Sequence, residues 1–382
     1  TDITDNTIAD YRLPSAAAGL PNTGYIMQGQ IDVPYYLPLA DSASNITNLL
    51  TGTWTANDTL AAANPALAAP SSKVTYRFPF AKKQATETIP FVLSTPDTAL
   101  VTKPANGWPI VIYQHGIFGS RGDHLPIANQ LGAACLSDGG TGTGVPLNAA
   151  NNELADVLPG GQDMPRCFAT IGIDMPLHGV APTRLGGTLD SLASLGFSVD
   201  VDSAANGFAA RDWSATHYAG LHERHYGWRK TSDTDSTPAT MVYSTDTAVA
   251  DGNSAEYYIN LGLPPASRDN LRQSVADLLG LRFGINFLTD VSSSELNIDK
   301  SQVHFLGQSL GSIAGVDFLA LTNTAIAGAP DVVNEMFKVQ ASTLSVPVQG
   351  LAYALMESEN TGALLKSNVA LGGSQEFFDL VM

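Results

Sequence analysis

Three short and almost continuous apolar runs restrict the fold of this sequence more than any other feature. They read WPIVIYQHG, FATIGIDMPLHG and QVHFLGQS, and they begin at Trp108, Phe168 and Gln302. A strand that is covered on both faces has this kind of composition, and such strands are typical of parallel sheets. We therefore predict that the three runs are buried strands of one mainly parallel sheet.

Segments with helical periodicity separate these runs. HLPIANQLGAACL begins at His124, and SRDNLRQSVADLLGLRFGINFLTD begins at Ser267, which we predict to be the N-cap of its helix. The second helix has one apolar face that is expected to pack on the sheet, formed by Leu271, Val275, Leu278 and Leu281. Buried strands that alternate with amphipathic helices predict an α/β fold.

Two regions are assigned from the change in sequence texture near residue 70. Residues 1–70 are rich in Thr, Ala, Asn and Pro, and we interpret them as an N-terminal extension or a small β-rich module. Residues 71–382 are predicted to form the α/β domain. At its start, KVTYRFPF (73–80) and TIPFVLSTP (88–96) alternate apolar and polar residues, as half-buried strands do.

Two long excursions interrupt the alternation of strands and helices. They cover residues 137–166 and 180–265 and have no regular periodicity. Loops of this length in a compact domain are usually lids, binding loops or disordered segments. Cys135 and Cys167 flank the first excursion and are the two cysteines of the chain. One disulfide between them is expected in an exported protein, and two buried free thiols are the alternative.

The balance of charge restricts the partners of the chain. Its 36 acidic residues outnumber its 19 basic ones, which gives a net charge of −17. Because binding to a phosphate backbone requires basic patches, we expect no nucleic-acid partner. No apolar run reaches the roughly 18 residues of a membrane-spanning helix. The chain starts without the regions of a signal peptide, so on the hypothesis of export the signal has already been removed.

The pentapeptide Gly307-Gln308-Ser309-Leu310-Gly311 is the strongest candidate for a chemical site. It fits the nucleophile-elbow pattern G-x-S-x-G, in which a serine occupies a sharp turn between a strand and a helix. The glycines remove side chains that would clash across the turn. The turn would expose the Ser309 hydroxyl and leave the Leu310 N–H free to stabilise an oxyanion.

A second candidate stretch, QHGIFGSRGD (114–123), also follows a buried strand. Many serine hydrolases form the other half of the oxyanion hole from backbone N–H groups at such a position. Gly116 permits the tight turn there, and the N–H of Ile117 or Phe118 is the expected donor. In this interpretation His115 orients the loop and transfers no proton.

Two further groups of polar residues are weaker candidates. Asp174 and His178 follow another strand, at the edge where ligands of open α/β sheets gather, so they are candidates for the pocket wall. Structural hydrogen bonding of the turn is the favoured alternative for both. His222 and His225 have a spacing that suits a metal, but the sequence offers no further ligands beside them. We expect no metal and no cofactor.

The sequence around Ser309 lacks a partner for proton transfer. In the α/β-hydrolase fold the acid and then the histidine follow the serine in the chain, and no histidine follows Ser309 here. Two or three more strands would also be expected after this point. We therefore expect the chain to be the N-terminal part of a longer enzyme whose base and acid lie beyond Met382. The competing hypothesis makes His178 or His225 the base.

Several of these stretches, in this order, resemble the extracellular bacterial lipases known as virulence-factor lipases, which include surface-exposed lysophospholipases. The resemblance covers roughly residues 25–382, and its matching pieces are VPYYL, GWPIVIYQHGIFGSRGD, GIDMPLHG, ERHYGW, RDNLRQSVADLLGLR and GQSLGSIAG. It implies an α/β-hydrolase, exported or held at the bacterial cell surface, with Ser309 as nucleophile. The chain departs from the pattern at Gln308, where many lipases have histidine, and in the length of the excursion at 137–166.

The leading hypothesis is therefore a secreted serine hydrolase that cleaves carboxylic esters of lipids. Its expected partners are a lipid or acyl-ester substrate, a membrane or lipid surface, and the C-terminal remainder of the same protein. The alternative hypothesis is a non-catalytic binding or adhesion module built on a hydrolase scaffold.

Overall fold

The computed structural model describes most of the sheet and its helices. The described residues are 13–14, 24–57, 72–101, 103–134, 147–148, 153–154, 167–179, 223–230, 241–243, 255, 257–260, 263–289, 296–348, 357, 362 and 366.

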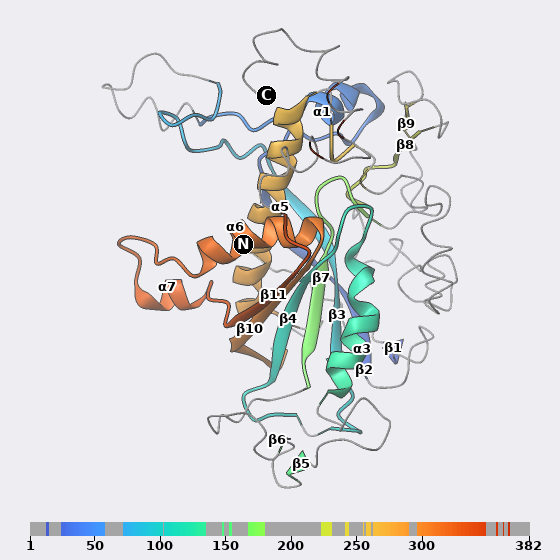
Figure 1. Ribbon diagram of the computed structural model, residues 1–382, viewed down its shortest axis with the longest axis vertical. Coiled ribbons are helices and arrows are strands. Elements are labelled where there is room, and N and C mark those ends of the chain that lie inside the picture. The colour runs from blue at the N-terminus through green and yellow to red at the C-terminus, as the bar shows by residue number, and fades with distance from the viewer. Residues whose placement is uncertain are drawn as a thin grey trace.

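A mixed seven-stranded sheet forms the centre of the molecule (Figure 1), in the order β1-β2-β3-β7-β4-β10-β11. Its strands are β1 (Leu13–Pro14), β2 (Gly24–Tyr35), β3 (Ala85–Pro96), β4 (Trp108–Gln114), β7 (Ala169–Ile173), β10 (Ile298–Gln308) and β11 (Ala341–Ser345). Strands β7, β4, β10 and β11 run parallel, whereas β1, β2 and β3 add an antiparallel side. The predicted α/β fold with a mainly parallel core is confirmed, and the three apolar runs are β4, β7 and β10.

Helices cover both faces of this sheet. They are α1 (Ile46–Thr51), α3 (Leu125–Ala133), α5 (Pro264–Gly284), α6 (Leu310–Thr322) and α7 (Asp331–Glu335), with 3₁₀ turns η3 (Ala43–Asn45), η4 (Arg121–His124) and η8 (Ile285–Phe287). In β3, Val92 packs with Leu125 of α3, whereas its neighbours Phe91 and Leu93 belong to the core cluster that includes α5. Successive strand residues point to opposite faces, so α3 and α5 lie on opposite sides of the sheet.

The predicted apolar face of α5 is confirmed. Val275, Leu278 and Leu281 are buried, and all three pack in the main core with Leu271 at its margin. The predicted start of the helix is wrong, because α5 begins at Pro264 and not after Ser267. Proline is favourable at the first helical position, where its missing N–H has no intrahelical partner to lose.

The prediction of a strand at 73–80 is wrong, whereas TIPFVLSTP lies within β3. Residues 73–80 form a turn with isolated bridges at Lys73 and Ala81. The alternation failed as a strand signal because its apolar residues share no buried face. Phe78 is buried, but Tyr76 and Phe80 are exposed.

The sequence 24–35, which we assigned to an N-terminal extension, forms strand β2 of the central sheet. It pairs with β3 from Gly24↔Pro96 to Tyr35↔Ala85. The boundary proposed at residue 70 therefore falls between two strands of one sheet.

Most of the two long excursions lies outside the described residues. Within the first, β5 (Leu147–Asn148) pairs with β6 (Glu153–Leu154), and within the second, β8 (Trp228–Lys230) pairs with β9 (Met241–Tyr243). Among the helices that the structure describes, none is long and apolar enough to span a membrane.

Candidate functional site

Backbone strain gathers at the carboxyl edge of the parallel strands. Each of these four strands is followed within four residues by a non-glycine residue with positive φ: Phe118 after β4 (62°), Leu177 after β7 (59°), Ser309 after β10 (51°) and Val346 after β11 (60°). Such conformations cost on the order of 1–3 kcal/mol each and concentrate at active sites and ligand clamps. This edge is therefore the candidate functional site.

Ser309 occupies the sharp turn between β10 and α6. Its backbone has φ 51° and ψ −117°, and its side chain is exposed although the residues after it are buried. The Ser309 N–H donates to the Ser345 carbonyl at 2.9 Å, and the Ser312 N–H donates back to the Ser309 carbonyl at 2.8 Å. The neighbouring strand and the first turn of α6 thus hold the strained serine from both sides.

The two glycines of the pentapeptide are required by close backbone contacts. A Cβ atom on Gly307 would lie 2.7 Å from the Gly311 carbonyl oxygen. A Cβ atom on Gly311 would lie 2.2 Å from the Gln114 carbonyl oxygen and 2.6 Å from that of His115. The turn therefore closes only because both positions lack a side chain, which is the steric requirement of the nucleophile elbow.

The loop after β4 lies directly beside Ser309. A Cβ atom added to Gly116 would lie 3.2 Å from the Ser309 Cβ and 3.8 Å from the Ser309 Oγ. The Gly119 N–H donates to the Gly116 carbonyl at 3.1 Å, which closes a turn with Ile117 and Phe118 at its centre. The structure thus brings together the two stretches that sequence reasoning selected for nucleophile and oxyanion hole.

His115 fixes the orientation of this loop. Its Nε2 accepts a hydrogen bond from the Met175 N–H at 3.1 Å, so its Nδ1 carries the proton and donates to the Gly116 carbonyl at 2.7 Å. Because the trans peptide is planar, the Ile117 N–H points opposite to this carbonyl. The neutral, fully buried ring therefore directs the Ile117 N–H away from the interior of the loop.

The second candidate donor is Leu310, the first residue of α6. An N–H at this helical position has no partner inside the helix and carries part of the positive end of the helix dipole. The side chains of Leu310 and Ile117 pack in the same apolar cluster with Met175 and Tyr258. Both candidate donors are thus anchored by one cluster. The remaining candidate of the pentapeptide, Gln308, is exposed and accepts a hydrogen bond from the Tyr113 hydroxyl.

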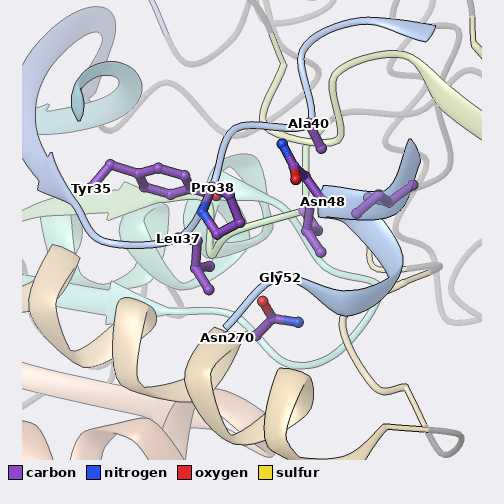
Figure 2. A pocket seen from close by; sticks show the side chains of 9 residues that line it. Tyr35, Leu37, Pro38, Ala40, Asn48, Gly52 and Asn270 are labelled. Atoms are coloured by element: carbon purple, nitrogen blue, oxygen red, sulfur yellow. The ribbon is translucent and has the colours of Figure 1, made fainter. Parts of the chain in front are cut away.

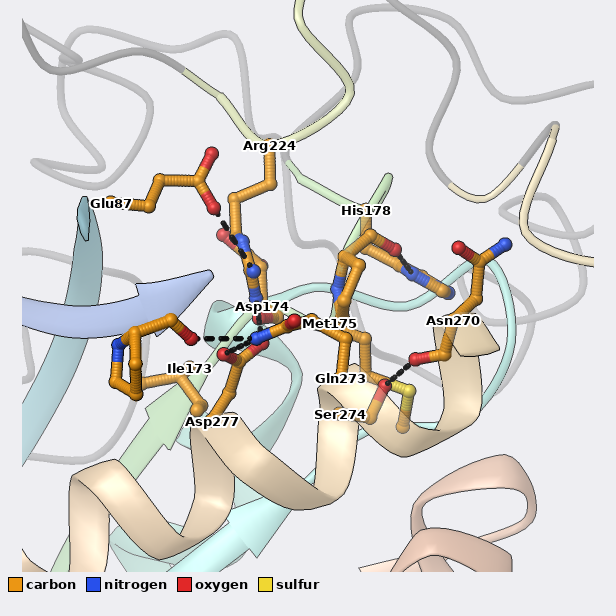
Figure 3. A network of polar contacts seen from close by, with 12 residues as sticks. Glu87, Ile173, Asp174, Met175, His178, Arg224, Asn270, Gln273, Ser274 and Asp277 are labelled. Carbon is orange, nitrogen blue, oxygen red and sulfur yellow. Dashed lines mark hydrogen bonds and ion pairs between the residues drawn. The ribbon is translucent and has the colours of Figure 1, made fainter. Parts of the chain in front are cut away.

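A buried ionic network begins at Arg121, at the end of this loop, and Figure 3 shows its continuation around Arg224, Glu87 and Asp277. Arg121 donates to Asp174 through its backbone N–H at 2.6 Å and through its guanidinium at 2.5 Å. The same guanidinium makes a bidentate pair with Glu223, at 2.7 and 2.9 Å. All three side chains are at least 97% buried. Asp174 therefore binds the end of the loop 114–123, an arrangement that matches the alternative of structural hydrogen bonding.

Arg224 extends the network to the sheet and to α5. It lies 2.8 Å from Asp277 and 3.3 Å from Glu87, and it donates to the Asp174 carbonyl at 2.6 Å. Burial raises the pKa of Asp277 to about 6, although the nearby Arg224 charge opposes the shift. Sequence reasoning missed Glu223 and Arg224, and their only signal was that they open the stretch ERHYGW.

The histidines near this edge are buried, whereas Ser309 is exposed. His178 is fully buried and bonds through Nδ1 to the Pro176 carbonyl at 2.9 Å, and burial lowers its pKa well below the usual value. Its Nε2 has no hydrogen-bond partner within the described part of the chain. His225 is also buried and accepts from the Gly227 N–H. Neither arrangement supports the hypothesis of a base supplied from upstream.

Two other sequence candidates have limited structural descriptions. Cys167 is buried and disulfide-bonded, whereas Cys135 lies outside the described residues. His222 also lies outside them. Among the residues that are described, no group of three His, Cys, Asp or Glu side chains is placed to hold a metal ion.

The pocket in Figure 2 is separate from Ser309 and very small. Its volume of about 10 Å³ is at the lower limit for a single water molecule. It is lined by Tyr35, Leu37, Pro38, Ala40, Asn48, Leu49, Gly52, Leu177 and Asn270.

Comparison of the chain with protein-family models, curated proteins and solved structures finds no match.

Proposed function

We propose that this protein is a serine hydrolase of the α/β-hydrolase type that cleaves carboxylic esters through an acyl-enzyme on Ser309. The observation that carries the proposal is the exposed serine at positive φ, held between two obligatory glycines at a strand-to-helix turn. A strained, outward-pointing serine in this setting is the hallmark of a nucleophile elbow. The loop at Gly116 lies beside the serine and supports the same proposal, in which the Ile117 N–H is the second donor of the oxyanion hole.

In the proposed reaction the Ser309 Oγ attacks the ester carbonyl carbon and transfers its proton to a base. The N–H groups of Leu310 and Ile117 stabilise the oxyanion that forms, an interaction that is stronger in the transition state than with the neutral carbonyl. The intermediate collapses to the acyl-enzyme, and the base returns the proton to the departing alkoxide. Water then releases the acid by the same steps. We assign the base to a histidine outside the described residues.

The apolar surroundings of Ser309 support esters with apolar acyl groups as substrates. Phe118 is 44% exposed on the loop beside Ser309, and Val346 is 71% exposed directly after the strand that binds the Ser309 N–H. Both are held at positive φ, which is a genuine outlier for a β-branched or bulky residue. An acyl chain between them would bury apolar surface on both sides. The resemblance to extracellular lipases favours the same substrates and an exported protein.

The proposal is tested by the hydrolysis of p-nitrophenyl esters of several chain lengths by the full-length protein. We expect Ser309→Ala to lower kcat by a factor of at least 10³, because removal of a serine nucleophile leaves only the contribution of the oxyanion hole. Ser301→Ala, an exposed serine on the same strand, is the matched control and retains activity. Unchanged hydrolysis by Ser309→Ala would reject the proposal and leave the binding-module hypothesis.

A further inference from the structure

Residues 72–84, which we name the basic loop, form an exposed cationic segment on a strongly acidic protein. The loop carries Lys73, Arg77, Lys82 and Lys83, four of the 19 basic residues of the chain. No Asp or Glu occurs between residues 59 and 86, although the chain contains 36 of them. The local charge is therefore opposite to the net charge of −17.

The loop is held in a fixed conformation by backbone hydrogen bonds. The Thr75 and Phe78 backbones bond reciprocally at 3.0 Å, so Tyr76 and Arg77 form the tip of a two-residue turn. The Asn57 N–H donates to the Phe80 carbonyl at 2.8 Å, and the Lys82 N–H donates to the Thr55 carbonyl at 2.8 Å. The tip therefore projects from a supported base.

The aromatic side chains of the loop divide into one anchor and two exposed groups. Phe78 is 9% exposed and packs with Ala56 and Val74. Tyr76 at the tip is 99% exposed, and Phe80 is 63% exposed. An anchored turn thus presents two aromatic side chains to solvent, each close in sequence to a cation.

The basic loop lies at the same end of the sheet as Ser309. Strand β3 runs antiparallel to β7 with Phe91 opposite Ile173, the last residue of β7. Ala85, the first residue of β3, therefore lies six residues, or about 20 Å, beyond the carboxyl edge. The loop continues outward from there, as the light-blue trace at the upper left of Figure 1.

We propose that the basic loop docks the protein onto an anionic lipid surface. A tyrosine such as Tyr76 is favourable at the level of lipid headgroups, because its apolar ring and its polar hydroxyl are both accommodated there. A phenylalanine such as Phe80 can bury its ring at the boundary between headgroups and acyl chains. Lys and Arg side chains beside the rings are attracted to the negative surface potential of anionic lipids. An anionic surface would repel the rest of the chain, which is acidic, so the basic loop is the expected point of contact.

This proposal goes beyond the proposed hydrolase function and does not depend on it. Docking through the loop would turn the carboxyl edge, and with it Ser309, toward the lipid. The Ser309→Ala variant is expected to bind lipid like the unmodified protein, so failure of one proposal leaves the other standing.

The test is co-sedimentation of the full-length protein with phosphatidylcholine vesicles that contain about 30% phosphatidylserine, an anionic lipid. We expect binding to these vesicles, and at least tenfold weaker binding to vesicles of phosphatidylcholine alone. Arg77→Ala together with Lys82→Ala should weaken binding by about 25-fold, since each cation near the surface contributes about fivefold. Tyr76→Ser together with Phe80→Ser should also weaken it. The matched control, Val332→Ser with Lys338→Ala, changes an exposed apolar residue and an exposed cation of the α7 region and retains binding.

The Tyr76→Trp variant provides a readout that does not depend on loss of binding. The fluorescence of the introduced indole should shift to shorter wavelength when vesicles with phosphatidylserine are added, because the ring leaves water. The proposal is overturned by absence of binding to these vesicles, by equal binding of the loop variants, or by an indole emission that vesicles leave unchanged. Binding to an acidic protein or to heparin without binding to vesicles also overturns it.

Discussion

Replacing Gly311 by alanine tests whether Ser309 is positioned by the close approach of three backbone segments, which are the end of β4, the end of β10 and the first turn of α6. The new Cβ atom would lie 2.2 Å from the Gln114 carbonyl oxygen, about 1.2 Å inside the 3.4 Å at which ordinary contact begins. The Gln114 oxygen is a backbone atom and the position of the new Cβ is fixed by the backbone, so neither can move away by rotation of a side chain. Overpacking of this kind costs about 1–3 kcal/mol or more. The end of β4 and the first turn of α6 must move apart.

That movement separates the two halves of the proposed oxyanion hole. A shift of about 1 Å at a reacting group costs on the order of 100-fold in rate. We therefore expect the free energy of unfolding of Gly311→Ala in urea to fall by about 1–3 kcal/mol, and the rate of Ser309 phosphonylation by a fluorophosphonate to fall about 100-fold. Gly122→Ala is the control, because the nearest atom to its new Cβ would be the Ser120 Oγ at 3.8 Å, an ordinary contact distance. A Gly311→Ala protein as stable and as reactive as this control would refute the steric reasoning.

The surroundings of the site give three further predictions. Glu223→Gln removes a buried charged partner of Arg121 and should lower the free energy of unfolding in urea by about 3–5 kcal/mol. The control Glu335→Gln changes an exposed ion pair and should lower it by less than about 1 kcal/mol. Equal losses in the two variants would contradict the buried network. Because the pKa of Asp277 is raised to about 6 in the folded protein, protonation of its carboxyl group favours the folded state by about 3 kcal/mol. This stabilisation is fully present below about pH 4 and is lost as the pH rises through about 6. The stability of the unmodified protein relative to Asp277→Asn should fall across this range, and parallel pH profiles would exclude the shift. His115→Ala should lower kcat for ester hydrolysis and leave KM nearly unchanged, and His115→Asn should recover part of the lost kcat. A change in KM alone would exclude a positioning role for His115.

Strands β4 and β7 of the parallel core could be predicted from the sequence because their burial on both faces leaves a nearly unbroken apolar run, whereas β10 is buried at alternate residues near its end and β11 is largely exposed. Residues 108–114 and 169–173 are buried throughout. The elbow could be predicted because part of its steric requirement is local: a Cβ atom on Gly307 would meet Gly311, four residues later, whereas the contact of Gly311 with Gln114 joins distant segments. Contacts between neighbours in the chain leave a readable pattern.

The features that the sequence did not reveal depend on contacts between distant segments. Arg121 pairs with Glu223, which lies 102 residues later in the chain. Arg224 pairs with Asp277, which lies in helix α5. Nothing near these charges distinguishes them from solvated surface residues. The error at 73–80 has the opposite origin, because alternation predicts a strand only where one face is covered, and Tyr76 is exposed.

The central claim is that Ser309 is the nucleophile, and the most direct measurement is the site of covalent modification. The full-length protein is treated with a fluorophosphonate, digested and mapped by mass spectrometry. We predict one phosphonylated residue, Ser309, and loss of ester hydrolysis in proportion to its modification. An adduct on another serine, or full activity after complete modification of Ser309, would contradict the claim.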